Sequence, residues 1–214
     1  ARAVEAAARA EVGAETADLR YGVESLVTQL GVITELVASR ARFADLVVLP
    51  RPYGTGVGIE AEAVLEAALF DGKAPVLVLP EKGLGEATQP RRIVLAWNQS
   101  AEAMVAAKLA LPFLKAAEQV SITVVDPPRS DADRSDPGGA LCQMLVRHGV
   151  NAEVSVLARS HPRVSDVILR HASDIDADLI VMGAYGHSRF REAILGGATR
   201  NMLENAKIPV LMAH

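Results

Sequence analysis

The sequence predicts an α/β protein built on a doubly wound, mainly parallel β-sheet. Seven short apolar runs, rich in β-branched residues, alternate with longer amphipathic stretches. Most of the runs are continuously apolar, which is typical of strands buried on both faces. The strand–helix–strand alternation therefore favours a sheet with helices on either side. We expect strands at residues 45–49, 75–79, 92–97, 120–125, 152–157, 178–182 and 209–212.

Helical spacing identifies the main stretches between these runs. Residues 101–117 are predicted to be helical, and residues 164–172 present one apolar face made of Val164, Val167, Ile168 and Ala172. Another helix is expected to begin after Gly197 and to run through Leu203. The single cysteine, Cys142, lies in an apolar helical pattern, so we interpret it as a packing residue rather than a nucleophile.

Composition excludes several classes of protein. The net charge of −4 and the 22% of charged residues give no reason to expect a nucleic-acid or acidic-membrane partner. No run of apolar residues is long enough for a transmembrane helix, and no signal peptide is recognisable. One cysteine cannot form an internal disulfide. We therefore expect a cytoplasmic protein without nucleic-acid or membrane partners.

Two pieces of the chain repeat in order and spacing. Residues 44–48 match residues 177–181 at an offset of 133 (177 − 44), and residues 73–77 match residues 207–211 at an offset of 134 (207 − 73). An offset of this length indicates two copies of one domain rather than a solenoid. We expect a first domain at 1–80, a linker at 81–90 and a second domain at 91–214. The alternative is a smaller, unrelated first half that matches by chance.

The repeat also predicts an N-terminally incomplete first domain. The second copy starts near Arg91, and the same offset places the start of the first copy at about −42 (91 − 133). The first copy would then lack its first strand, first helix and second strand. We expect a preceding segment of roughly 40 residues or more.

A glycine-rich stretch follows the strand that ends at Met182. Gly183 and Gly186 come first, and after nine intervening residues Gly196 and Gly197 open a helix. Loops at the carboxyl ends of parallel strands are where α/β folds bind ligands. Glycine lets main-chain N–H groups approach phosphate, and a helix N-terminus presents unpaired N–H groups. We therefore interpret this stretch as a phosphate-binding loop; the alternative is that its glycines only make turns.

Side chains in the same stretch can add to phosphate binding. Ser188 and Thr199 offer hydroxyl donors, whereas His187, Arg189 and Arg191 offer positive charge.

The pattern Gly183-x2-Gly186-x9-Gly196 resembles that of the universal stress protein family. It follows the strand Ala-Asp-Leu-Ile-Val-Met-Gly and precedes a final Ile-Pro-Val-Leu strand. Residues 92–100 and 120–126 are similar to the family's first strand with its turn and to its second strand. The resemblance implies a five-stranded parallel sheet of the nucleotide-binding α-hydrolase-like type. It also implies a role in the stress response, dimerisation through the last strand, and ATP or a related adenine nucleotide as ligand.

The resemblance implies a set of nucleotide-binding residues. The main chain would hold the phosphates at Gly183, Gly186, Gly196, Gly197 and Ala198, and Thr199 lies just beyond. Asn98 would lie near the ribose and adenine, and Val124 would meet the adenine through its backbone. Ser100, His187 and Arg189 complete the set of candidates.

Three positions depart from the family's pattern. Asn98 stands where nucleotide-binding members usually have Asp, so no carboxylate is present for a metal ion or the sugar. Gly197 stands where they have Ser or Thr, and His187 where they have Lys or Arg. One hydroxyl donor is therefore lost, and the loop charge depends on pH or on Arg189.

The corresponding region of the first copy, residues 49–58, lacks this loop. Pro50 takes the place of Gly183 and has no N–H to offer a phosphate. Its three glycines, Gly54, Gly56 and Gly58, do not have the spacing of a dinucleotide fingerprint. We interpret the first copy as a degenerate structural partner.

Three functions remain open at this point. The preferred one is a regulatory nucleotide-binding protein, because no residue set resembles a general base beside a nucleophile. The second is a slow ATP hydrolase, with Ser100 and Asp126 near the phosphates and a divalent ion such as Mg²⁺. The third is a nucleotide-free interaction module, in which strands near 75–79 and 209–212 form a homodimer or pair the two domains within one chain.

Overall fold

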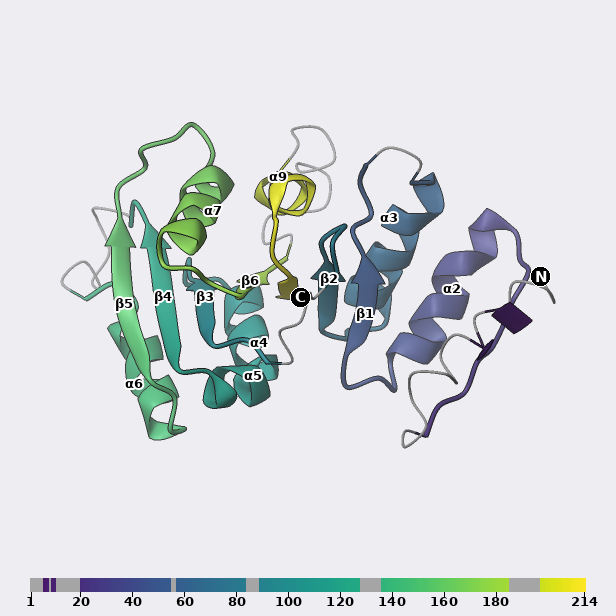
Figure 1. Cartoon of the computed structure of the whole chain (residues 1–214), viewed down its shortest axis with the longest axis horizontal. Coiled ribbons are helices and arrows are strands. Elements are labelled where there is room, and N and C mark those ends of the chain that lie inside the picture. Colours follow the sequence, from purple (N-terminus) through teal and green to yellow (C-terminus); the bar gives the residue numbers. More distant parts are fainter. Residues whose placement is uncertain are drawn as a thin grey trace.

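One seven-stranded sheet with helices on both faces organises the chain (Figure 1). The computed structural model describes residues 6–7, 9–10, 20–54, 57–83, 89–127, 136–184 and 197–214. Every expected strand is present within two residues at each end. The strands are β1 (Val47–Pro50), β2 (Val76–Leu79), β3 (Arg92–Ala96), β4 (Gln119–Val125), β5 (Ala152–Leu157), β6 (Leu179–Gly183) and β7 (Val210–Ala213).

The strand order is β1-β2-β7-β6-β3-β4-β5. The last five of these strands are mutually parallel, which confirms the parallel sheet expected for the second half. Strands β1 and β2 are parallel to each other, and β2 joins β7 in antiparallel pairing. The outer edge of the last strand is thus occupied by a strand of the same chain.

The described helices lie on the two faces of the sheet. They are α2 (Leu30–Ala41), α3 (Ile59–Glu66) with its π-helical continuation η1 (Ala67–Asp71), α4 (Ala101–Leu109), α5 (Leu111–Ala116), α6 (Gly139–Arg147), α7 (Val164–Asp174) and α9 (Ala198–Asn205). The helix expected at 101–117 is divided at Ala110, because Pro112 cannot donate a helical hydrogen bond. None of the described helices combines the length and hydrophobicity that a membrane span requires.

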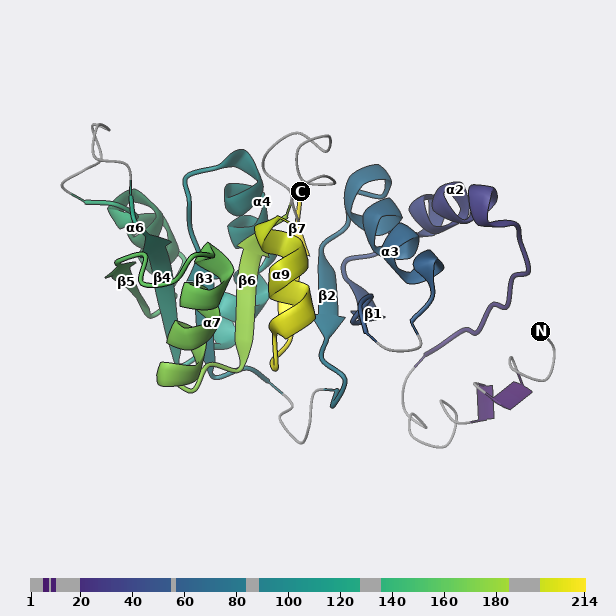
Figure 2. The same ribbon diagram turned by 90° about the horizontal axis from the view of Figure 1, so that it is seen from above.

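Two aliphatic cores enclose the sheet. Helices α2, α3, α7 and α9 cover one face, where Leu69 and Met202 are fully buried. Helices α4, α5 and α6 cover the other face, around Leu95 and Leu114. Seen from above, α7 and α9 lie on one side of β3 and β6, and α4 and α6 lie on the other (Figure 2). Strands covered on both sides explain the continuously apolar runs of the sequence.

Cys142 fits the packing role expected for it. The residue is half-buried in α6, and its thiol donates a weak hydrogen bond to the carbonyl of Ala152, with 3.4 Å between sulfur and oxygen. Burial, reinforced by the nearby Asp136 carboxylate, raises the pKa of the thiol above its ordinary value. The reactive thiolate is therefore disfavoured.

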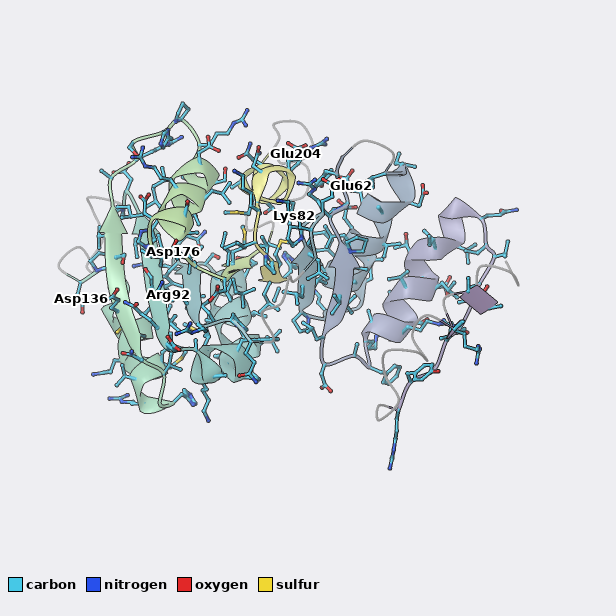
Figure 3. The ribbon with its side chains drawn as sticks, in the orientation of Figure 1. Glu62, Lys82, Arg92, Asp136, Asp176 and Glu204 are labelled. Carbon is cyan, nitrogen blue, oxygen red and sulfur yellow. The ribbon has the colours of Figure 1, made fainter. Side chains whose placement is uncertain are left out.

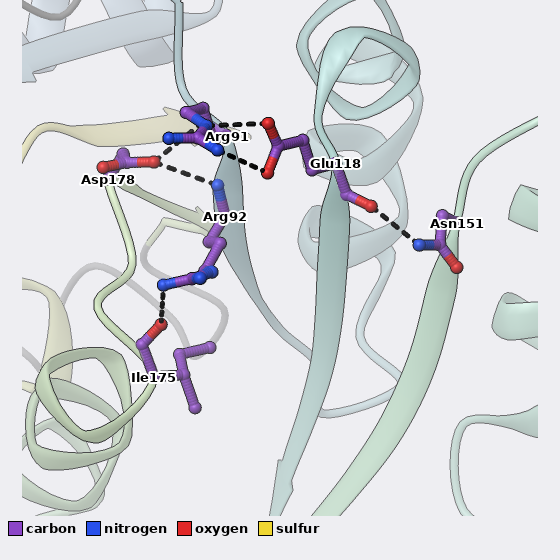
Figure 4. A network of polar contacts seen from close by, with 6 residues as sticks. All are labelled: Arg91, Arg92, Glu118, Asn151, Ile175 and Asp178. Carbon is purple, nitrogen blue, oxygen red and sulfur yellow. Dashed lines mark hydrogen bonds and ion pairs between the residues drawn. The ribbon is translucent and has the colours of Figure 1, made fainter.

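A polar clamp holds the beginning of β3 between its neighbours (Figure 4). The carboxylate of Asp178, just before β6, accepts the main-chain N–H groups of Arg91 at 2.8 Å and Arg92 at 3.0 Å. The Arg91 guanidinium binds both carboxylate oxygens of Glu118, at 2.7 and 3.0 Å. This bidentate pairing lowers the pKa of Glu118 and raises that of Arg91. The clamp anchors the chain where the second half begins.

The two halves also meet through side chains beside the sheet. The Arg200 guanidinium lies 4.9 Å from the ring centroid of Tyr53, whose hydroxyl donates to Glu62 at 2.9 Å. Arg51 donates to the carbonyl of Glu204 at 3.3 Å. Figure 3 shows Glu62 on α3 and Glu204 on α9, on either side of this contact. A polar seam therefore supplements the β2–β7 pairing.

A buried hydroxyl cluster lies between β4, β5 and α7. The Ser121 hydroxyl, on a residue only 1% exposed, donates to Ser155 at 2.9 Å and accepts from His171 Nε2 at 2.9 Å. Burial lowers the pKa of His171 below its ordinary value, and the Asp174 and Glu153 carboxylates oppose the change only in part. The folded protein thus favours the neutral imidazole.

This burial predicts a pH-dependent stability. As the pH falls below the ordinary value of 6.5, the unfolded chain binds a proton at His171 before the folded chain does. The free energy of unfolding should therefore be highest above that pH and should decrease down to the folded-state pKa. We expect His171→Gln to show a smaller decrease between about pH 8 and pH 5 than the wild type in urea unfolding.

The control for this measurement is His148→Gln, because His148 is exposed at the end of α6. That variant should keep the wild-type pH dependence. A His171→Gln protein that loses as much stability in acid as the wild type would contradict the assignment.

Candidate functional site

The candidate site lies where the order of the strands reverses. After β3 the chain runs outward through β4 and β5, and it then returns to place β6 on the other side of β3. Open α/β sheets bind ligands in the crevice that such a switch point leaves at the carboxyl ends of the strands. Residues 97–100, after β3, and Ala184, after β6, lie at this edge.

Asn98 and Ser100 form the turn between β3 and α4. The side-chain oxygen of Asn98 accepts the N–H of Ser100 at 3.2 Å, so its amide nitrogen is the group left for a ligand. Asn98 is exposed, and that nitrogen has no hydrogen bond within the described residues. The Ser100 hydroxyl oxygen accepts the N–H of Ala103 at 3.1 Å and caps α4, but its proton can still be donated. Both residues thus offer donors suited to ligand oxygens.

Two non-glycine residues adopt left-handed backbone conformations at this edge. Gln99, in the turn between β3 and α4, has φ 63°, and Asp126, directly after β4, has φ 47°. Such conformations cost on the order of 1–3 kcal/mol and cluster at functional sites. Their position on adjacent strands supports a ligand site at the same edge.

The main chain at the end of β4 directs Val125, rather than Val124, towards β3. The carbonyl of Thr123 accepts the N–H of Trp97 from the β3 side, and the N–H of Asp126 donates to a carbonyl of β5. Because alternate residues of a strand direct their polar groups to opposite sides, those of Val124 face β5. The main-chain contact of Val124 with adenine stays a prediction; the polar groups that face β3 at this edge are those of Val125.

Gly183 is required by packing. A Cβ added there would lie 2.5 Å from the nitrogen of Ala103 and 2.7 Å from the carbonyl carbon of Glu102. The N-terminal backbone of α4 therefore rests directly on the end of β6. This close contact explains the glycine without a phosphate, so Gly183 by itself does not argue for a ligand.

We therefore expect Gly183→Ala to destabilise the fold. Overpacking of this kind typically lowers the free energy of unfolding by about 1–3 kcal/mol, which urea denaturation would measure. The matched control is Gly22→Ala, where a Cβ meets no atom within 4 Å, and it should change stability by less than about 0.5 kcal/mol. Equal stability of the Gly183→Ala and wild-type proteins would refute the close packing.

The N-terminus of α9 is a candidate anion site. It follows Gly197, no side chain of the described residues caps it, and its first turn carries no acidic residue. By contrast, α4 is capped by Ser100 and carries Glu102 in its first turn. The unpaired N–H groups and positive dipole end of α9 are thus less compensated than those of α4. Thr199 is only 3% exposed, so its side chain is buried.

Several predicted site residues lie outside the described residues. They are Gly186, His187, Ser188, Arg189, Arg191 and Gly196. Their roles stay predictions. Within the described residues, no group of three or more His, Cys, Asp or Glu side chains could hold a metal ion. The expectation of Mg²⁺ therefore also stays a prediction.

His214 was not predicted, and it lies beside the candidate site. Its Nδ1 donates to the carbonyl of Ala184 at 2.9 Å, next to the end of β6. The ring of Phe70, from the first half, meets it edge-on with 4.8 Å between ring centroids. Because β7 is parallel to β6, with Ala213 opposite Gly183, the ends of both strands share one edge. The parallel pairing of β7 with β6 is the signal that could have identified His214 as a neighbour of the candidate site.

The fold agrees with the comparison against known families. The model of the universal stress protein family matches residues 90–214, which is more than half of the chain. The chain therefore belongs to the universal stress protein family. A curated universal stress protein from Synechocystis is 36% identical over 73 residues, which are 34% of this chain and 24% of that protein. The chain thus matches about a quarter of the length of this relative.

Solved structures with a similar fold cover different shares of the chain. A universal stress protein from Archaeoglobus fulgidus has a TM-score of 0.62 at 20% identity, covering 85% of this chain and 64% of that one. One from Pseudomonas aeruginosa, described as putative, has a TM-score of 0.62 at 16% identity, covering 98% and 78%. A universal stress protein in complex with cAMP has a TM-score of 0.50 at 21% identity, covering 59% and 98%. At these identities the likeness concerns the fold.

Proposed function

We propose that this universal stress protein binds an adenine nucleotide at the carboxyl edge of β3 and β6 and acts as a regulatory protein with little catalytic activity. The observation that carries the proposal is the uncapped N-terminus of α9 beside the switch point of the sheet. A helix N-terminus with free N–H groups favours phosphate. The family fold, shared with a protein solved in complex with cAMP, supports the choice of ligand.

Each part of the nucleotide has a proposed contact. The main chain at Gly197, Ala198 and Thr199 binds the phosphate, together with Gly186 and Gly196 of the predicted loop. His187 and Arg189 are the predicted cations of that loop.

The sugar and base contacts come from β3 and β4. The amide nitrogen of Asn98 and the hydroxyl of Ser100 donate to oxygens of the ribose or phosphate. The N–H and C=O groups of Val125, which face the end of β3, suit the donor and acceptor edge of adenine.

We further infer that the two halves are copies of one domain, related by a two-fold axis through the β2–β7 pairing. Leu77 lies opposite Leu211, its own equivalent at the offset of 134. The main-chain bond from Val47 to Pro75 recurs from Ile180 to Pro209, at 2.9 and 3.0 Å. The Pseudomonas aeruginosa structure, which covers 98% of this chain, also supports a common architecture for both halves.

In this arrangement only the second copy carries a nucleotide site. Pro50 stands at the position of Gly183 and offers no N–H. Helix α3 also carries Glu60 and Glu62 in its first turn, and both repel an anion.

Ala198→Pro tests the phosphate contact. Proline is tolerated at the first position of a helix, and the preceding Gly197 has the extended ψ of 170° that proline requires. The substitution therefore removes one N–H without breaking α9. We expect titration calorimetry with AMP, ADP and ATP, with and without Mg²⁺, to show binding about tenfold weaker than to the wild type.

The matched control is Ile59→Pro, at the first position of α3 after the extended Gly58. It should leave nucleotide affinity unchanged. Equal affinities of the Ala198→Pro and wild-type proteins would remove α9 from the site. A wild-type protein that binds none of these nucleotides at millimolar concentration would instead favour an interaction module. A wild-type protein that turns over ATP, with the turnover lost in Ala198→Pro together with binding, would favour a hydrolase.

A further inference from the structure

The turn between β5 and α7 brings positive charge to the carboxyl edge of the sheet. Its residues, 158–163, include two arginines and a histidine, Arg159, His161 and Arg163, and no acidic residue. Because β5 is parallel to β4, β3 and β6, this turn lies at the same edge as the N-terminus of α9. The guanidinium groups therefore lie at the edge proposed for the nucleotide.

Arg163 is held against α9 by Asn201. The Asn201 side chain is buried between α7 and α9, and the residue is only 5% exposed. In the amide orientation that satisfies every partner, its nitrogen donates to the Ser165 hydroxyl at 2.6 Å and to the Asp166 carboxylate at 3.0 Å. Its oxygen accepts from the Arg163 guanidinium. This contact fixes the guanidinium and leaves its other N–H groups for an anion.

The contact places Arg163 beside the first turn of α9. The main-chain N–H of Asn201 donates to the carbonyl of Gly197 at 3.1 Å, so Asn201 follows the N-terminus by one turn. Side chains of a helix lean towards its N-terminus, which brings the Asn201 amide back over that first turn. The guanidinium bound to the amide therefore lies next to the uncapped end of α9.

Arg200, the other arginine near this turn, is engaged on the opposite side of α9. Its guanidinium pairs with Glu204 at 2.9 Å and lies 4.9 Å from the ring centroid of Tyr53, in the first half. Figure 2 shows α9 between the first half and α7, and α7 packs over β3 and β4. Arg163 is thus the arginine on the side of the switch point. It makes no ion pair within the described residues.

We propose that Arg163 binds the β- or γ-phosphate of the nucleotide and thereby makes the site selective for ADP and ATP over AMP. The inference rests on the proposed nucleotide site, in which the main chain of α9 binds one phosphate. Arg163 lies beside the same turn and receives the next phosphate. The planar guanidinium suits this role, because its N–H groups match the spacing of phosphate oxygens.

Asp166 opposes this attraction. Its carboxylate shares the Asn201 amide with Arg163, so it lies close to the bound phosphates in this arrangement. A negative charge so near to a polyphosphate weakens its binding. Asp166→Asn removes the charge and keeps a side-chain oxygen that can accept from Asn201.

The test is titration calorimetry of ATP, ADP and AMP with the complete chain, in a buffer with EDTA so that no divalent ion screens the phosphates. Arg163→Gln should weaken binding of ATP and ADP at least about tenfold and that of AMP less than about threefold. Asp166→Asn should tighten ATP binding about threefold and leave AMP binding unchanged. A purely structural link between α7 and α9 predicts neither the selective loss nor the gain.

The matched control is Arg170→Gln, which removes the same charge from the far end of α7, where Arg170 pairs with Asp174 at 3.8 Å. It should bind all three nucleotides like the wild type. Unchanged ATP affinity in Arg163→Gln, equal losses for ATP and AMP, or the same loss in Arg170→Gln would each overturn the proposal. If Arg163→Gln does not fold, Asp166→Asn decides alone, and an ATP affinity that does not rise counts against Arg163.

The AMP titration separates this inference from the proposed function. A wild-type protein that binds AMP, with no selective loss of ATP in Arg163→Gln, would refute the role of Arg163 and leave the nucleotide site intact. A wild-type protein that binds none of the three nucleotides would refute both.

Discussion

The antiparallel pairing of β2 with β7 is the interaction on which the rest of the structure depends. It is centred on Leu77 and Leu211, and it turns two parallel sheets into one continuous sheet. Both apolar cores therefore contain residues from each half. The pairing also brings Phe70 against His214 beside the end of β6. It uses the edge of the last strand and leaves β1 at the end of the sheet.

The proposed ligand edge combines two helix N-termini that differ in their surroundings. Helix α4 is capped by Ser100 and carries an acidic first turn. Its backbone packs closely against Gly183, which stabilises the conformation of this edge. Helix α9 has neither a side-chain cap nor an acidic first turn. Since unpaired N–H groups favour anions, the polarity of the site is carried by α9. The donors of Asn98 and Ser100 complete an edge suited to oxygen-rich ligands.

Local patterns in the sequence were sufficient for the strands and for most of the helices. Continuous apolar runs and helical spacing depend on which residues are buried, and burial on both faces leaves a strong signal. The division of the helix at Ala110 follows from Pro112, a signal that the sequence contains. Which residue at the end of β4 directs its main chain towards β3 depends on strand register, which no local pattern encodes. The packing reason for Gly183 was hidden because α4 approaches it from about 80 residues earlier in the chain (183 − 103 = 80).

The sequence by itself determined the fold class and the family resemblance of the second half, whereas the ligand edge that it indicates stays a prediction. These follow from periodicity and from short motifs, whose physical basis is local. Only the tertiary structure decided how the halves join and that His214 and Phe70 adjoin the candidate site. Each of these depends on main-chain pairing and packing between residues far apart in the chain, and those contacts exist only once the sheet has assembled.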